Sequence, residues 1–258
     1  MKTHGGRTIS VGLLGPFEIT VGGVPVVLTA GRLRALVSVL ALSAGRPVSV
    51  DRLSLAVWSG EEPPVNVRRS VQTYLARLRG LLGPASIRST PTGYALNVDS
   101  EAVDVLRFVG LLEAADGDAA RLRLAEALEL WRGEPFDGVP STWLHESEAP
   151  WLVERYLIAL ERRLDLDISG GRHERVVVEL SELTTRYPLR ESLWARLLIA
   201  LDRSGRRADA LTRYETVRAR IAAELGVEPD TTLQRIHVDL LARRTPSLRS
   251  ADHPHAPN

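Results

Sequence analysis

The sequence predicts a mainly α protein that begins with a small β component and divides into two parts. The first thirty residues contain short alternating hydrophobic runs broken by Gly and Pro, whereas almost everything after residue 103 has the spacing of amphipathic helices. The charge divides at a similar place. Residues 1–100 carry 11 Lys and Arg against 5 Asp and Glu, and residues 101–258 carry 22 against 27. A basic part joined to an acidic part indicates two roles, one of them with a polyanion, unless chance has scattered the charges on solvated faces.

The β component lies in the stretch ISVGLLGPFEITVGGVPVVL, residues 9–28. Its alternation predicts short strands at 9–14, 17–21 and 24–28. The pair Gly22-Gly23 tolerates positive φ at both positions and predicts a tight hairpin turn between the last two strands. We therefore expect a small antiparallel sheet before the first helix.

Three helices and a second hairpin follow the sheet. In chain order, we expect a helix at 32–45, a helix at 49–58, a loop at 59–66, a helix at 66–82 and a hairpin at 86–98. Gly45 is expected to end the first helix, Ser49 or Asp51 to cap the second, and Pro63-Pro64 to keep the loop out of a helix. A small sheet, two short helices, a longer third helix and a terminal hairpin in this order are typical of a winged helix-turn-helix.

The third helix, NVRRSVQTYLARLRGLL, has one apolar side and one side rich in arginine. At 100° per residue, the side chains that share the face of Val71 are Val67, Leu75, Leu78 and Leu82. No Asp or Glu occurs from 65 to 82, so the four arginines repel one another unless an anion neutralises them. Arg and Gln also suit the base edges of guanine and adenine. The pattern therefore favours DNA binding over an ordinary solvated face.

We expect the third helix and the hairpin, as the wing, to form the DNA-binding site. The candidate contacts are Arg68, Arg69, Gln72, Thr73, Arg77 and Arg79 on the helix, with Arg88 and Thr92 on the hairpin. The alternative for Arg88 is a plain surface position on a strand.

Seven segments between residues 103 and 244 have helical spacing, and the short links YPLRES and SGRR predict antiparallel helix pairs. Aligning Trp194 with the tryptophan of a tetratricopeptide repeat places further residues on repeat positions, with Leu198 at the glycine position as a departure. These residues are Leu197, Ala210 and Tyr214, and, one period earlier, Val176, Leu180 and Pro188. We expect stacked helical hairpins of tetratricopeptide type, with an irregular helical bundle as the alternative. The expected domains are therefore 1–100, 101–244 and a disordered tail at 245–258.

Several stretches in order resemble the Streptomyces antibiotic regulatory protein family of transcriptional activators, over about residues 9–243. LLGPFEITVGGVPVVLTAGRLRALVSVLAL is similar to that family's opening strands and first helix, and VDRLSLAVWSGEEPPVNVRRSVQTYLARLRGLLG to its second and third helices. STPTGYALNV resembles the wing. ALELWRGEPFDGV and the stretch from YPLRESLW to VDLL look like its bacterial transcriptional activator domain. The resemblance implies an OmpR-like winged helix followed by that domain.

The resemblance also implies partners. It implies binding to direct repeats in promoter DNA near the −35 region, recruitment of the RNA polymerase holoenzyme, and target genes for secondary metabolites. In such folds the loop between the second and third helices faces polymerase, so Glu61 and Glu62 are the candidate polymerase contacts; the alternative is that they only solubilise the loop. Direct repeats imply a homodimer on DNA.

Enzyme and cofactor motifs are not found. His145-Glu146 begins like a zinc-protease motif, but no His follows four residues later. Phosphate-binding, dinucleotide-binding and serine-hydrolase glycine motifs do not occur, and His253 and His255 lie in a polar tail. The chain has no Cys, no long apolar run and no apolar core near its N-terminus. We expect a cytoplasmic non-enzyme without cofactors, metals or membrane contact.

One competing class is an interaction scaffold, in which a tetratricopeptide-like groove grips a peptide or senses a small effector and the basic part is an adaptor. RNA binding is less favoured, because no aromatic platform accompanies the basic helix. The tryptophans at 131, 143, 151 and 194 are expected to be packing anchors, although Trp143 and Trp151 flank LHESEAP and could instead line a pocket.

Overall fold

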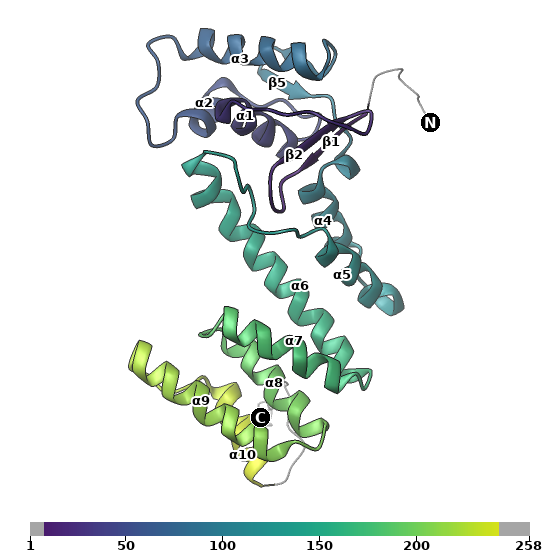
Figure 1. The fold of residues 1–258 in the computed structure, drawn as a ribbon, viewed down its shortest axis with the longest axis vertical. Helices are drawn as coiled ribbons and strands as arrows, with labels where there is room; N and C mark the ends of the chain where they lie inside the picture. Colours follow the sequence, from purple (N-terminus) through teal and green to yellow (C-terminus); the bar gives the residue numbers. More distant parts are fainter. Residues whose placement is uncertain (1–7, 243–258) are drawn as a thin grey trace, which may run out of the picture. The chain divides into compact units, whose positions relative to one another are not determined.

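The computed structural model describes residues 8–242, which form two compact units that divide between Ala159 and Leu160. The predicted tail, 245–258, with His253 and His255, lies outside the described residues. The first unit holds the strands and the helices up to the start of α6 (Ala149–Ser169), and the second unit begins within α6 (Figure 1). A mainly α fold with a small N-terminal β component is confirmed.

The N-terminal sheet is antiparallel, with the strand order β1 (Ile9–Gly12), β2 (Glu18–Val21) and β3 (Val24–Pro25). Gly22 and Gly23 have φ of 61° and 79° and form the predicted hairpin turn between β2 and β3. The predicted strand at 9–14 is too long. It ends at Gly12 because the backbone N–H groups of the next two residues donate to a carboxylate from a distant helix instead of to another strand.

That carboxylate belongs to Asp104, the first residue of α4 (Asp104–Glu113). It accepts the N–H of Leu13 at 2.8 Å and that of Leu14 at 2.9 Å. Burial raises the pKa of the Asp104 carboxyl above its ordinary value, against the opposing effect of these N–H groups and of the Arg132 guanidinium. Arg132 lies 3.4 Å from Asp104, and its backbone N–H donates to the Leu14 carbonyl at 2.7 Å. The end of β1 is thus fixed to the helical half of the sequence.

Helices α1 to α3 and a second hairpin follow the order that the sequence predicts (Figure 1). Their bounds are α1 (Gly31–Leu42), α2 (Val50–Trp58), α3 (Val67–Leu82), β4 (Ile87–Thr90) and β5 (Gly93–Leu96). The first helix ends at Leu42, three residues before the predicted end, and Gly45 lies in the turn that follows, with φ of 71°. Ser49 caps α2 by accepting the N–H of Arg52, which decides between the two predicted caps.

One hydrophobic core runs through the first unit and includes residues from both predicted halves. It joins Leu36, Leu53 and Leu75 of the three winged-helix helices to Phe108 of α4 and Leu144, all of them fully buried. The remaining elements of this unit are η1 (Ser100–Ala102), η2 (Gly117–Ala119), α5 (Ala120–Glu129) and the π-helical turn η3 (Leu144–Glu148). The winged helix therefore shares its core with the first helices of the helical half.

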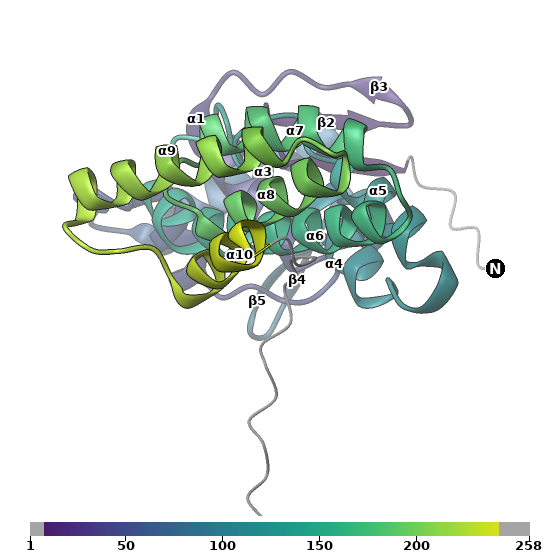
Figure 2. The ribbon, with the colours of Figure 1, turned by 90° about the horizontal axis from the view of Figure 1, so that it is seen from below.

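The second unit stacks antiparallel helices, as the repeat alignment predicts. The helices after α6 are α7 (His173–Arg186), α8 (Glu191–Arg203), α9 (Arg207–Leu225) and α10 (Thr231–Leu241). Helix α8 packs against α7, α9 and α10 (Figure 2). Trp194 and Tyr214 are buried, and the Trp194 indole N–H donates to the Pro188 carbonyl at 2.9 Å.

Replacing Asp104 by alanine tests the join between β1 and α4. The change leaves two buried backbone donors without their acceptor, so we expect Asp104→Ala to lower the free energy of unfolding by about 2 kcal/mol in urea denaturation. Glu101→Ala changes an exposed carboxylate that lines a surface groove together with Asp104; it is the matched control and should change stability by less than about 0.5 kcal/mol. Equal effects of both changes would show that the Asp104 hydrogen bonds do not hold the strand.

Candidate nucleic-acid interface

Helix α3 turns its apolar side inward and its polar side to solvent, as predicted. Val71, Leu75, Leu78 and Leu82 are buried, and Val67 is half-buried against the same core. The exposed side chains are Arg68, Arg69, Gln72, Thr73, Ala76 and Arg77. Because the apolar stripe fixes the rotation of the helix, it also fixes which residues a ligand of this surface would meet.

The N-terminus of α3 is set by Asn66, whose side-chain oxygen accepts the N–H of Arg69 at 2.9 Å. An N-cap of this kind satisfies one of the free amides of the first helical turn. Gly83, with φ of 106°, follows the last helical residue. Both ends of α3 are therefore encoded locally, by residue types that favour helix ends.

The arginines of α3 fall into two groups. Within residues 8–242, the guanidinium groups of Arg68, Arg69 and Arg77 form no hydrogen bond or ion pair with another side chain or with the backbone. Arg79 differs: it donates to the Ile87 carbonyl at 2.8 Å and to the Ser89 hydroxyl at 3.1 Å. The first group leaves its positive charge available to an anion, whereas Arg79 fastens α3 to the wing.

The wing is the hairpin of β4 and β5, whose register pairs Ile87 with Leu96 and Thr90 with Gly93. It is also joined to the segment before α2, because Val48 and Tyr94 exchange backbone hydrogen bonds of 2.8 and 3.0 Å. Gly93 has φ of 152°, and a Cβ atom there would lie 1.9 Å from the Val48 carbonyl oxygen. Only glycine allows this close approach.

The two predicted wing contacts, Arg88 and Thr92, are both exposed. Thr92 lies in the turn between the strands, which puts it at the tip of the hairpin. Arg88 donates to the Gly45 carbonyl at 2.6 Å, so its guanidinium is held against the turn after α1. Thr73 likewise donates its hydroxyl proton to its own helix, to the Arg69 carbonyl at 3.0 Å.

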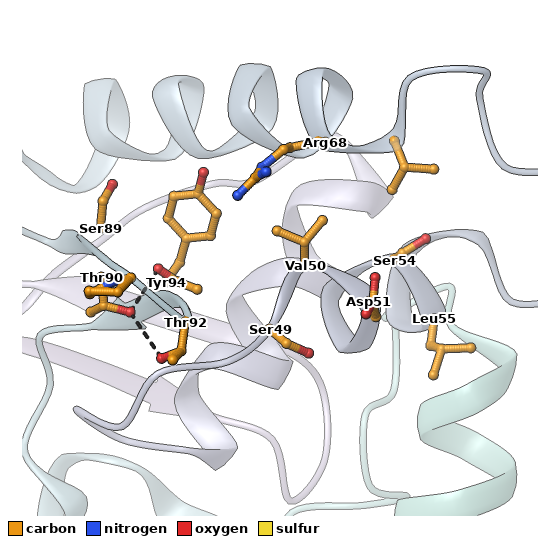
Figure 3. A pocket seen from close by; sticks show the side chains of 13 residues that line it. Ser49, Val50, Asp51, Ser54, Leu55, Arg68, Ser89, Thr90, Thr92 and Tyr94 are labelled. Atoms are coloured by element: carbon orange, nitrogen blue, oxygen red, sulfur yellow. Dashed lines mark hydrogen bonds between the residues drawn. The ribbon is translucent and has the colours of Figure 1, made fainter.

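A groove of about 710 Å³ lies between the N-terminal ends of α2 and α3 and the wing (Figure 3). Arg68 reaches into it from α3, and the Tyr94 ring stands on the wing side between Arg68 and Ser89. Ser49 and Val50, at the N-terminus of α2, form the floor beside them. A helix N-terminus and an arginine on one groove favour a phosphate, although Asp51 brings a negative charge to the same lining.

The sequence did not predict this groove. Tyr94 was identified only as part of a strand, and Ser49 only as a helix cap. The predicted N-cap of α2 could have indicated the groove, because the start of a helix presents free backbone N–H groups to an anion and a basic helix lies next to it. The wing closes the third side of the groove because Val48 pairs with Tyr94. These residues are 46 positions apart, so local sequence patterns do not predict the contact.

The predicted polymerase-contact loop, 59–66, presents its two acidic residues differently. Glu61 forms an ion pair of 2.9 Å with Arg32 of α1, which also donates to the Tyr74 hydroxyl at 3.2 Å. Glu62 is exposed and forms no ion pair within the described part of the chain. Val65 projects fully into solvent. Of the two predicted contacts, Glu62 is thus the one whose charge is not already paired.

Two further findings concern metals and membranes. Within residues 8–242, no three His, Asp or Glu side chains lie close enough together to hold a metal ion. Among the helices that the structure describes, none combines the length and the apolar character needed to cross a bilayer. His145 directs its ring N–H to the Val139 carbonyl at 2.9 Å.

The sequence predicted that the tryptophans are packing anchors, but one of them is exposed. Trp194 is buried and Trp131 packs between Phe108 and Tyr156, but Trp151 is 47% exposed. Its ring lies against the Arg155 guanidinium, 4.7 Å from the centroid. Helical spacing alone did not distinguish it, because α6 presents this face to solvent rather than to the core of the first unit.

Comparison with known proteins assigns the chain to a family. The family described as bacterial transcriptional activator domain matches residues 98–241. Regulatory protein AfsR of Streptomyces coelicolor is 40% identical over 238 residues, and regulatory protein DnrI of Streptomyces peucetius is 36% identical over 251 residues. The chain belongs to the Streptomyces antibiotic regulatory protein family of transcriptional activators.

Family members differ in length. The matched region covers 89% of this chain but 24% of AfsR, and 90% of this chain and 92% of DnrI. Transcriptional regulatory protein EmbR of Mycobacterium tuberculosis is 35% identical over 92% of this chain, which spans 64% of EmbR. The chain therefore corresponds to nearly all of DnrI and to part of the longer relatives.

A solved structure of this family has the same fold. Mycobacterium tuberculosis EmbR, in complex with a low-affinity phosphopeptide, matches with a TM-score of 0.86 and 33% identity over 94% of this chain and 67% of that one. The order of a winged helix followed by a helical domain is thus shared with a family member.

Two glycine substitutions test the geometry of the wing and of α3. We expect Gly93→Ala to lower the free energy of unfolding by more than about 2 kcal/mol, because the new methyl group collides with the Val48 carbonyl. Gly80→Ala is the matched control: it lies in α3 with open space around it, so it should stabilise the protein by up to about 1 kcal/mol. Chemical denaturation measures both. A harmless Gly93→Ala would contradict the tight packing of the wing.

Proposed function

We propose that this regulator is a sequence-specific DNA-binding transcriptional activator that places α3 in the major groove of promoter DNA. The observation that carries the proposal is the outer face of α3, where Arg69 and Arg77 are exposed and unpaired within residues 8–242, next to the groove between α2 and the wing. Arginines without a protein partner repel one another and gain from phosphates and guanine edges.

The α3 residues divide by position on the helix. Arg69, Thr73 and Arg77 lie on the side opposite the buried face and are proposed to meet base edges and phosphates there. Arg68 and Gln72 lie on the same flank of α3 as Arg79, toward the wing, and Arg68 lines the groove there. The wing would contribute Thr92 at its tip and Arg88 near its base. Arg79, already bonded to the wing, is proposed to act chiefly by positioning α3.

The finer parts of the proposal concern DNA architecture and partners. We propose that two copies bind side by side on direct repeats near the −35 region, and that the bound dimer recruits the RNA polymerase holoenzyme in the cytoplasm. The family's name points to antibiotic biosynthesis genes as the target class. A saturating footprint that covers both repeats would support the dimer, and one confined to a single half-site would contradict it.

The two parts of the sequence would then divide the work, with residues 1–100 reading DNA and residues 101–244 serving activation. The alternative is a scaffold that binds a peptide or effector through its helical repeats, with the basic part as an adaptor. The test uses the full chain, because residues on both sides of position 100 contribute to one core. Site-selective DNA binding favours the activator, and equal binding to all DNA favours the scaffold.

The loop 59–66 is the proposed polymerase contact. Glu62 offers an unpaired charge to a basic surface, whereas the Glu61 charge is shared with Arg32. A long-range attraction between exposed opposite charges mainly speeds association and weakens with salt. We therefore assign the acidic contact to Glu62 first, with Glu61 holding the loop.

Replacing Arg69 or Arg77 tests whether α3 binds the bases and phosphates of promoter DNA. We expect Arg69→Ala and Arg77→Ala each to weaken binding to a promoter fragment with direct repeats by about 1–3 kcal/mol if they read bases, or to reduce the salt slope by about 1 if they bind phosphate. Titrations at two or more salt concentrations distinguish these cases. Arg123→Ala, an exposed arginine on α5, is the control. Unchanged promoter affinity and an unchanged salt slope in both α3 variants would show that α3 is not the DNA-recognition helix.

Replacing Glu62 tests the polymerase contact separately from DNA binding. We expect Glu62→Gln to reduce transcription in a purified system with RNA polymerase holoenzyme, while promoter affinity stays within about twofold of the unmodified protein, since one exposed charge contributes about 1 kcal/mol or less. Glu113→Gln, an exposed carboxylate at the end of α4, is the matched control. Equal transcription from both variants would contradict the role of Glu62.

A further inference from the structure

The segment 141–148, which precedes and enters α6, lies against the outer face of α2 and the first residues of the loop 59–66. The backbone N–H of Trp143 donates to the Ser59 hydroxyl oxygen at 2.9 Å. The Arg52 guanidinium lies 3.3 Å from the Glu148 carboxylate and stands over the Trp143 ring, 5.4 Å from its centroid. These contacts join positions that are 84 and 96 residues apart in sequence.

The contacts hold α2 at two points. Arg52 and Ser59 are seven residues apart, which is two helical turns, so they lie on one face of the helix. The contact continues into the loop, because a Cβ atom at Gly60 would lie 3.3 Å from the Thr142 hydroxyl oxygen. Segment 141–148 therefore follows α2 to its end and reaches the residues from which the loop starts.

The segment is itself firmly placed. Leu144 is fully buried in the core of the first unit, and its N–H donates to the buried Ser141 hydroxyl at 3.3 Å. The His145 ring N–H donates to the Val139 carbonyl, and the backbone forms a π-helical turn, an uncommon geometry that occurs often at functional sites. A fixed segment can restrain a loop that packs against it.

Helix α2 is also held from its other side. Its opposite side, with Leu53, Ala56 and Val57, is buried in the core. Arg52 and Glu148 are 45% and 27% exposed, and exposed ion pairs contribute little to global stability. The contacts act instead where the chain leaves the helix, at Ser59, and the Glu61–Arg32 pair restrains the loop two residues later.

We propose that Ser59, through its bond from the Trp143 backbone, and Glu148, through its ion pair with Arg52, are positioning residues for the polymerase-contact loop: they hold the end of α2 so that the loop 59–66 keeps one arrangement when polymerase binds. The proposal rests on the proposed function of that loop. It assigns to the helical half a direct part in activation that is separate from DNA binding, since neither residue lies on α3 or on the wing. A loop that is already ordered loses less conformational entropy when its partner binds.

The test compares two double variants of the full chain. Ser59→Ala/Glu148→Gln removes the hydroxyl acceptor and the charge at the two contact points. Glu146→Gln/Ser147→Ala changes two exposed neighbours on the same π-helical turn, for which the described chain shows no contact with α2. A third variant, Arg52→Glu/Glu148→Arg, restores an ion pair with the charges exchanged. Each is measured for promoter affinity, transcription with RNA polymerase holoenzyme and hydrogen exchange of the amides in 59–66.

We expect Ser59→Ala/Glu148→Gln to reduce transcription about fivefold, equivalent to roughly 1 kcal/mol, with promoter affinity within about twofold and with faster amide exchange in the loop. The neighbour variant should match the unmodified protein, and the exchanged pair should recover more activity than Glu148→Arg alone. Unchanged exchange in the loop, or faster exchange with full transcription, would overturn the proposal. If the unmodified protein activated no promoter, the proposed function would fail. Faster amide exchange of residues 59–66 in Ser59→Ala/Glu148→Gln would then still show that these contacts restrain the loop.

Discussion

Burial of one apolar stripe of α3 is the interaction on which the proposed DNA-binding surface depends. Val71, Leu75 and Leu78 are completely buried, and their burial leaves the helix a single rotation about its axis. That rotation sends Arg69 and Arg77 outward together and brings Arg79 against the wing. A polar substitution in the stripe would therefore disturb the contacts of the arginines as well as the core.

The arginines of α3 and of the wing show how one residue type serves two purposes on one surface. Arg79 and Arg88 donate to backbone carbonyls of the wing and of the turn after α1, which keeps the hairpin at a fixed distance from α3. Arg68, Arg69 and Arg77 are exposed on α3 and carry its unpaired charge within the described residues. Rigid placement of the first group gives the second a defined geometry, which recognition of a regular polyanion requires.

Within the first unit, the helical half of the sequence supports the winged helix at two places. Asp104 accepts the backbone bonds that would otherwise extend β1, and Trp143 and Glu148 contact the outer face of α2. Both contacts lie away from the proposed DNA-binding face. Under the proposed function, this arrangement would let residues after position 100 influence the loop between α2 and α3 without covering α3, so that DNA and polymerase would meet separate surfaces.

The sequence by itself determined the features that depend on local periodicity: the hairpin at Gly22 and Gly23, the helix that starts after Asn66, its apolar and basic sides, and the repeat positions of Trp194 and Tyr214. Only the tertiary structure decided where long-range partners end or redirect these elements. Asp104 shortens β1, Arg32 takes up the charge of Glu61, and Arg79 turns toward the wing. The physical reason is that periodicity reports which face of an element is buried, whereas a hydrogen bond or ion pair depends on which distant atom the folded chain brings within about 3 Å.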